Sequence, residues 1–190
     1  MKKITVYCGS NKGKNAIFSQ GAVALANEMI KRDLSLVYGA GNVGLMGVIA
    51  DAMLAADKKV YGVIPQKLVD IEVAHQGCTE LTVVETMRDR KWLMAEKGDG
   101  FIAMPGGIGT FEELFEIMTL NQLAYIRKPL ALYNLNGYYD GLLKFLQHAV
   151  TEGFLHQAQL DLLIVGDNPA EILDKMAAFE PKYIDKWEVK

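Results

Sequence analysis

Short, mostly apolar runs alternate along the chain with stretches of helical spacing, and this alternation constrains the fold more than any other feature. Between the runs, apolar residues recur at helical intervals, as they do from Phe18 through Ala22 and Leu25 to Met29. Strands without a polar side are covered on both faces, which favours a parallel sheet between two layers of helices. The predicted strands are Ile4–Cys8, Leu34–Tyr38, Val60–Ile64, Leu81–Glu85, Phe101–Met104 and Pro129–Tyr133.

The predicted architecture is an α/β fold, a single-domain Rossmann-like doubly wound parallel sheet with helices on both faces, spanning residues 1–190. A chain of 190 residues, 51% of them hydrophobic, is long enough to bury one substantial core. In sheets of this kind the ligand lies at the carboxyl ends of the strands. The loops that follow the strands are therefore where we expect the chemistry.

Composition excludes several classes of partner. The net charge of −3 and the scattered basic residues give no reason to expect nucleic acid or an anionic membrane. No apolar stretch approaches the length of a membrane span, and Met1-Lys2-Lys3 leads directly into a strand, so we expect no signal peptide. Two isolated cysteines, Cys8 and Cys78, fit a reducing, cytoplasmic location.

A glycine-rich segment, Pro105 to Glu113, directly follows one predicted strand and precedes a helical pattern. A strand, a glycine turn and a helix in this order present unpaired backbone N–H groups and the positive end of a helix dipole to a cleft. Thr110 adds a hydroxyl group to this cradle. The segment predicts a phosphate or nucleotide site. A purely structural turn, whose acids only offset the helix dipole, is the alternative.

A second cluster of polar residues lies on one predicted helix. Met87, Arg90, Lys91 and Met94 share one helix face, so two cations interrupt an otherwise inward-facing stripe. They point either to solvent or into the cleft, where an arginine fork suits phosphate oxygens and sugar hydroxyls. Because this helix starts at the end of the strand Leu81–Glu85, we favour the cleft.

The loops after the first two strands are weaker candidates. The loop from Cys8 to Gly13 is either a ligand contact or an ordinary loop, and Cys8 is expected to be a buried apolar residue rather than a nucleophile. The segment from Gly39 to Gly44 has dinucleotide-binding spacing, but the following strand runs into Pro65 with no acid for the ribose. A nicotinamide-dependent dehydrogenase is therefore disfavoured.

The helix after Gly44 is apolar nearly all round, from Leu45 through Ile49 to Met53. Such a helix is buried, either by a second subunit or within one chain. We expect a homodimer. We expect no metal site and no Ser-His-Asp grouping, because the histidines fall in separate segments: His75, His148 and His156.

Taken together, the motifs resemble those of the Lonely Guy (LOG) family of phosphoribohydrolases, which includes proteins once labelled lysine decarboxylases. The pattern Pro-Gly-Gly-x-Gly-Thr-x-x-Glu is matched in full by Pro105 to Glu113. The pattern Met-His-x-Arg-Lys is matched at three positions, with Arg88 where the family has histidine. The resemblance extends over most of the chain, through Tyr7–Ser10, Val37–Gly47, Lys128-Pro129 and Asn136–Tyr139.

The resemblance implies an N-glycosidase that cleaves adenosine 5′-monophosphates, N6-modified ones included, into free base (cytokinin or adenine) and ribose 5-phosphate. It implies that Arg90 and Glu113 are the catalytic pair, and it requires no metal or organic cofactor. The substrate-binding residues that it implies are Ser10, Glu72, Met87, Arg90, Lys91, Gly106, Gly107, Ile108, Gly109, Thr110, Phe111, Glu112 and Thr119. Both adenine and an isopentenylated adenine are compatible with the motifs.

Two further interpretations remain open at the level of sequence. The first is a non-catalytic carrier of a nucleotide or phosphorylated cofactor with the same fold. A carboxylate close to an arginine favours an enzyme instead, because glycosidic cleavage passes through an oxocarbenium-like transition state that a carboxylate stabilises. The second is a lysine decarboxylase, although no residue marks a lysine for pyridoxal phosphate.

Overall fold

A seven-stranded parallel sheet forms the centre of the molecule in a computed structural model, which describes residues 1–71 and 73–180. The strands lie in the order β4-β3-β2-β1-β5-β6-β7. Their bounds are β1 Lys3–Tyr7, β2 Ser35–Tyr38, β3 Val60–Pro65, β4 Glu80–Val84, β5 Gly100–Ala103, β6 Leu130–Tyr133 and β7 Leu163–Gly166. The predicted α/β, doubly wound fold is confirmed.

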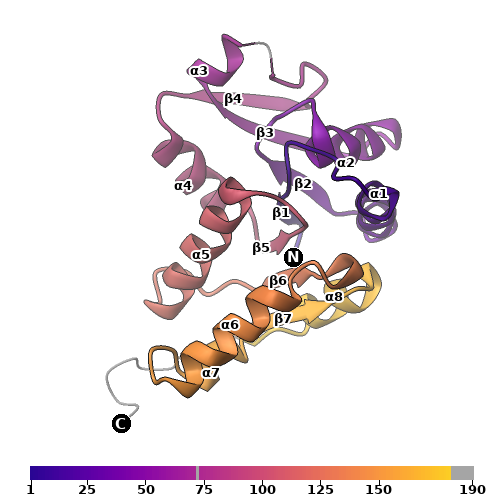
Figure 1. Cartoon of the computed structure of the whole chain (residues 1–190). Helices are drawn as coiled ribbons and strands as arrows, with labels where there is room; N and C mark the ends of the chain where they lie inside the picture. The colour runs from indigo at the N-terminus through magenta and orange to yellow at the C-terminus, as the bar shows by residue number, and fades with distance from the viewer. Residues whose placement is uncertain (72, 181–190) are drawn as a thin grey trace.

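Helices cover both faces of this sheet, as Figure 1 shows. One face is covered by α1 (Ala16–Lys31), α2 (Gly44–Ala55) and α8 (Pro169–Ala177). The opposite face is covered by α4 (Met87–Lys97), α5 (Ile108–Gln122) and α6 (Asp140–Thr151). Shorter helical turns lie in the connections: α3 (Gln66–Val69), the 3₁₀ turn η1 (Leu135–Gly137) and α7 (Gln157–Leu160). Among the described helices, none is both long enough and apolar enough to span a bilayer.

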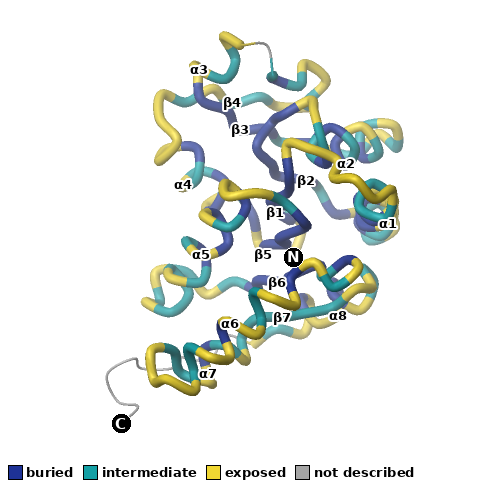
Figure 2. The backbone as a smooth tube through the Cα atoms, viewed as in Figure 1, coloured by how far each residue is buried: buried dark blue, intermediate teal, exposed yellow. Residues whose placement is uncertain are grey.

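Each face of the sheet has its own hydrophobic core, because successive side chains of a strand point to opposite sides. Ile4 and Val6 of β1 pack into the core beneath α1, α2 and α8. Tyr7 packs into the core beneath α4 and α5, where its ring stacks on Phe101. Figure 2 shows the result, with buried strands at the centre and exposed outer faces on the helices.

All six predicted strands are present, each within one residue of its predicted bounds. The seventh strand, β7, was not predicted. It forms the sheet edge beyond β6, and all of its residues are only half-buried. The apolar helix after Gly44 is α2, which buries Leu45, Ile49 and Met53 against α1 and the sheet of the same chain. Its apolar character therefore does not require a second subunit.

The strand order reverses between β1 and β5, and this reversal creates a crevice. The chain leaves β1 towards α1 on one face and leaves β5 towards α5 on the other. At the crevice the Gly9 N–H donates a hydrogen bond to the Pro105 carbonyl at 3.0 Å. The Leu45 N–H in turn donates to the Gly9 carbonyl at 3.0 Å. Three loops that are distant in sequence are thus held at one point.

Candidate active site

A cavity of about 400 Å³ opens at the carboxyl ends of β1, β2, β3 and β5. One end is polar and is formed by the glycine turn, the start of α5 and two charged side chains, Arg90 and Glu113. The other end is apolar and is formed by side chains from the segments around α2 and α3. The cavity therefore suits a ligand with an anionic group at one end and a flat or apolar group at the other.

The glycine turn leaves the first backbone N–H groups of α5 available to a ligand. Its N-cap residue is Gly107, which provides no side-chain cap. A Cβ atom on Gly107 or Gly109 would meet no atom within 4 Å, so both glycines border open space. Gly106 is different, because a Cβ there would lie 2.1 Å from Oγ1 of Thr110. The turn is packed at its first glycine and open at the next two.

The hydroxyl groups of two tyrosines bind backbone carbonyls in and just before the glycine turn. The Tyr138 hydroxyl donates a hydrogen bond to the Gly106 carbonyl, and the Tyr139 hydroxyl donates to the Met104 carbonyl at 2.6 Å. Both tyrosines lie between β6 and α6, so the distal half of the sheet braces the site without lining the main cavity. The family resemblance includes this tyrosine pair, although its hydrogen bonds to the turn are evident only in the structure.

A capping box fixes the start of α4 and with it the position of Arg90. The Asp89 N–H donates to the Thr86 hydroxyl at 3.1 Å, while the Thr86 N–H donates to the Asp89 carboxylate at 3.2 Å. Arg90 follows one residue later and is only 9% exposed. The helix therefore begins at a defined residue and directs the guanidinium inward.

Arg90 lies across the carboxyl ends of β2 and β3. Its Nε donates to the Val63 carbonyl and its Nη2 to the Gly39 carbonyl, both at 3.2 Å. A Cβ on Gly39 would lie 1.7 Å from Nη2, so only glycine leaves room for the guanidinium at this position. Gly39, the first glycine of the segment with dinucleotide-binding spacing, thus makes room for the side chain of Arg90.

Glu113 faces Arg90 from α5. Its Oε1 lies 3.9 Å from Nη1 of Arg90, and the residue is 8% exposed. Burial raises the pKa of Glu113 to about 7, because desolvation of the carboxylate outweighs the attraction of Arg90. A carboxyl group with a pKa near neutrality exchanges protons readily at physiological pH, as a general base must.

The structure brings most of the predicted site residues to this cavity. Besides Arg90 and Glu113, its lining includes Ser10, Met87, Gly107, Ile108, Gly109, Thr110 and Glu112. Gly106 borders a smaller adjoining hollow of about 180 Å³, which Ser10 and Gly107 also line. A ligand that occupies the cavity therefore meets the first loop and the glycine turn together.

Three predicted residues lie elsewhere, and one lies outside the described residues. Phe111 packs edge-on against Tyr139, with ring centroids 6.3 Å apart. Lys91 forms ion pairs with Glu112 and Glu116 between α4 and α5 and does not itself line the cavity. Thr119 is exposed further along α5. Glu72 is not among the described residues.

The apolar end of the cavity was missed by sequence reasoning, except for Met87. The missed apolar side chains are Val43, Met46, Ile64, Leu68, Ile71 and Val73. The sequence signals for them were the unbroken apolar character of α2 and the apolar residues that follow β3.

Cys8 lies buried in the cavity wall, where desolvation raises the pKa of its thiol far above the ordinary value. Across residues 1–71 and 73–180, no group of three His, Cys, Asp or Glu residues is placed to hold a metal.

The sheet order and the glycine turn at its crevice define a Rossmann-like α/β protein. Residues 46–176 match the family described as "Possible lysine decarboxylase". The chain is 41% identical over 182 residues to cytokinin riboside 5'-monophosphate phosphoribohydrolase LOG7 of Arabidopsis thaliana, covering 96% of this chain and 84% of that protein. It is also 41% identical over 182 residues to the LOG enzyme of Oryza sativa subsp. japonica, covering 96% and 75%. The chain belongs to the LOG family, as its motifs predicted.

Solved structures of low sequence identity share the fold. The molybdenum cofactor carrier protein of Chlamydomonas reinhardtii superimposes with a TM-score of 0.71 at 16% identity, over 94% of this chain and 99% of that one. The molybdenum cofactor binding protein of Rippkaea orientalis superimposes with a TM-score of 0.69 at 19% identity, over 94% and 97%. At such identities the likeness concerns the fold alone.

Proposed function

We propose that this protein hydrolyses the N-glycosidic bond of adenosine 5′-monophosphates, N6-modified ones included, to a free base and ribose 5-phosphate. The observation that carries the proposal is the buried Arg90–Glu113 pair, which shares one cavity with an open glycine turn. The relatives at 41% identity over nearly the whole chain are named cytokinin riboside 5'-monophosphate phosphoribohydrolases, which supports the proposal.

The glycine turn binds the 5′-phosphate in this proposal. The unpaired N–H groups at the start of α5 and the hydroxyl of Thr110 provide donors, and the helix dipole favours the negative charge. Ser10 approaches from the loop after β1. Because Gly107 and Gly109 have no side chains, the phosphate can approach the backbone directly.

Glu113 and Arg90 act on the sugar. As the bond from ribose C1′ to the base breaks, positive charge develops on the sugar, and the Glu113 carboxylate stabilises it. The same carboxylate accepts a proton from the attacking water, whose oxygen bonds to C1′. The base leaves with the electrons of the broken bond and takes a proton from solvent. Two donors of Arg90 are fixed by backbone carbonyls, so its remaining Nη1 is directed towards the carboxylate and the sugar.

The apolar end of the cavity receives the base. Met46, Leu68 and Ile71 belong to it, and Met87 lines the same cavity with its Sδ 3.9 Å from Nη1 of Arg90. Thioether and aliphatic side chains pack well against a flat purine and against an aliphatic N6 substituent. This half of the cavity contributes binding and leaves the chemistry to the polar half.

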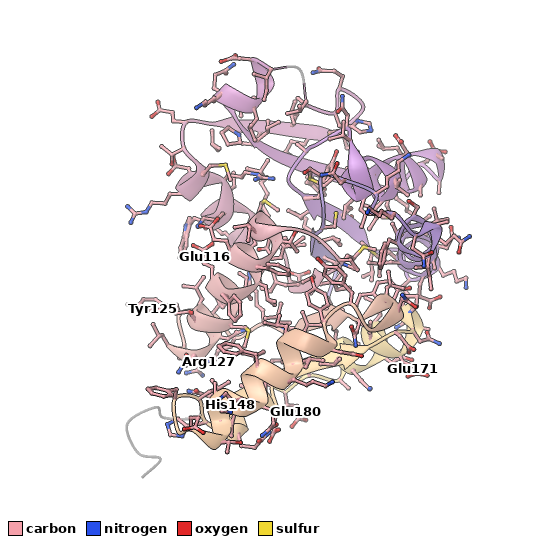
Figure 3. The ribbon with its side chains drawn as sticks, viewed as in Figure 1. Glu116, Tyr125, Arg127, His148, Glu171 and Glu180 are labelled. Atoms are coloured by element: carbon pink, nitrogen blue, oxygen red, sulfur yellow. The ribbon has the colours of Figure 1, made fainter. Side chains whose placement is uncertain are left out.

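The test is incubation with AMP and with isopentenyladenosine 5′-monophosphate, with released base followed by chromatography. Glu113→Gln keeps the size of the side chain and removes the carboxylate, so we expect kcat to fall by at least about a hundredfold. Glu171→Gln is the matched control, because Glu171 is exposed on α8 (Figure 3) and does not line the cavity. Release of base by Glu113→Gln at the native rate would contradict the proposal. Binding of both nucleotides without release would favour the carrier interpretation.

Three further parts of the proposal concern the whole molecule. Residues 1–190 form a single domain, supported by one continuous sheet built from strands between Lys3 and Gly166. The protein is a homodimer, supported by exposed apolar side chains on α4 and α5, among them Trp92 and Ile108. It resides in the cytoplasm, supported by its two free cysteines.

A further inference from the structure

The side chain of Lys91 lies between α4 and α5 instead of entering the cavity. Its Nζ is 2.7 Å from Oε1 of Glu112 and 3.5 Å from Oε1 of Glu116, and the side chain is 15% exposed. Figure 3 shows Glu116 projecting from α5 on the side towards α4. One lysine of α4 therefore binds two carboxylates of α5.

These two carboxylates flank Glu113 on the same helix. Glu112 and Glu116 are four residues apart, a spacing at which like charges repel on a helix surface. Both also repel a charge on Glu113 and raise its pKa, whereas Lys91 lowers that pKa. Without Lys91, Glu113 would be flanked by two uncompensated negative charges on α5.

We propose that Lys91 is a positioning residue, which neutralises Glu112 and Glu116 and so keeps Glu113 anionic, rather than a ligand of the phosphoribosyl group. This inference rests on the proposed function, in which the Glu113 carboxylate carries the chemistry. The adjacent cations Arg90 and Lys91 therefore have different roles. Arg90 contacts the reacting groups, and Lys91 acts through two glutamates.

Other groups near Glu113 do not substitute for Lys91. Arg90, on α4, is held by the carbonyls of Val63 and Gly39 and faces Glu113 itself. Tyr7 and Cys8, on β1, remain neutral because burial raises the pKa of both side chains. The charges that can change the field at Glu113 independently of Arg90 are therefore those of Lys91 and its two partners.

The experiment compares kcat and KM across pH for the native protein and Lys91→Met, with isopentenyladenosine 5′-monophosphate as substrate. We expect the acidic limb of the kcat profile to move to higher pH, with kcat near pH 6 reduced about tenfold for a displacement of about one pH unit. KM should change by less than about twofold, since no substrate contact is lost. Lys91→Arg should keep the native profile.

A compensation experiment distinguishes a positioning role of Lys91 from a role as a ligand of the phosphoribosyl group. Adding Glu112→Gln and Glu116→Gln to Lys91→Met removes the uncompensated charges, so the acidic limb should return towards its native position. Lys97→Met is the matched control, because Lys97 lies on the same helix and pairs with Glu80 at 2.7 Å, away from the cavity. We expect its pH profile to be native.

A large rise in KM for Lys91→Met, with an unmoved acidic limb and no compensation by the two glutamine substitutions, would overturn the inference. If the native protein released no base from any nucleotide, the proposed function would fail separately. The titration of the Glu113 carboxyl, followed by carbon NMR in the native protein and in Lys91→Met, would then decide. An identical titration in both proteins would overturn the role assigned to Lys91.

Discussion

Glu113 combines catalytic usefulness with a cost to stability, and both arise from its burial. Below its ordinary pKa of 4.5, the carboxyl is protonated in the folded and the unfolded chain, so no charge is buried. Because the folded pKa is raised to about 7, the folded state loses stability as pH rises between these two values. Above about pH 7 the unliganded protein holds a buried carboxylate at its full cost.

Glu113→Gln should therefore stabilise the unliganded protein at alkaline pH. At about 1.4 kcal/mol per pH unit, the gain near pH 8 is on the order of 3 kcal/mol, and it should vanish near pH 4.5. Urea unfolding of the native protein and the variant at several pH values measures it. A gain that is constant across pH, or a loss at pH 8, would contradict this account of the burial of Glu113.

The sequence predicted the position of Arg90 better than that of Lys91. Helical spacing placed Met87, Arg90, Lys91 and Met94 on one broad face, and it does not distinguish the two cations. Consecutive helix residues nevertheless point about 100° apart. That rotation directs Arg90 to the carbonyls of β2 and β3 and directs Lys91 to α5. Only the packing of α4 against its neighbours determines which cation enters the cavity.

Helix α4, which positions Arg90, is fixed at both ends. Its start is held by the capping box of Thr86 and Asp89. At its other end the amine of Lys128, from the segment before β6, donates to the carbonyls of Ala95, Glu96 and Gly98 at 2.9, 3.2 and 2.7 Å. A cation at a helix C-terminus also complements the negative end of the dipole.

Lys128→Met should lower the free energy of unfolding by about 1.5–3 kcal/mol, because it removes charged hydrogen bonds and leaves carbonyls unpaired. Chemical denaturation measures this loss. Lys175→Met, at an exposed position of α8, is the control and should be nearly neutral. Equal stability of the two variants would show that the Lys128 contacts contribute nothing to α4.

The sequence predicted the fully buried central strands, and it also predicted the partly exposed edge strand β4. The residues of β1 and β5 that face α1 and α2, such as Ile4 and Ile102, are fully buried, and their strands were predicted within one residue. The edge strand β7 was missed although Leu162 to Val165 is an apolar run. An edge strand that is half-buried has the same composition as a loop that covers a core, so the pattern alone does not separate them.

At the scale of the whole molecule, exposed apolar side chains occur on several elements, and α4 and α5 each carry some of them. Trp92 on α4 is 54% exposed, and Ile108 at the start of α5 is 81% exposed. Apolar side chains gathered on neighbouring helices are typical of protein–protein interfaces, where tryptophan is often a major contributor. We therefore expect the interface of the proposed homodimer on α4 and α5 and not on α2.

Trp92→Glu should convert the proposed dimer to monomers, because it places a charge where an apolar contact is expected. Analytical ultracentrifugation over a range of protein concentrations measures the change. Val23→Glu is the matched control, since Val23 is 40% exposed on α1, which covers the opposite face of the sheet. A native protein that sediments as a monomer, or a Trp92→Glu variant that remains a dimer, would contradict this placement.

The contact between Gly9 and Pro105 also has a consequence for the order in which the protein is built during synthesis. Strand β1 leaves the ribosome before its partner β5, which follows only after the whole chain from Cys8 to Asp99. Until then one edge of β1 remains unpaired, a situation that slows folding and invites association with other chains. The phosphate cradle, which belongs to the segment directly after β5, therefore forms only once this edge has been closed. A nascent chain that can bind nucleotide has by then paired both edges of β1.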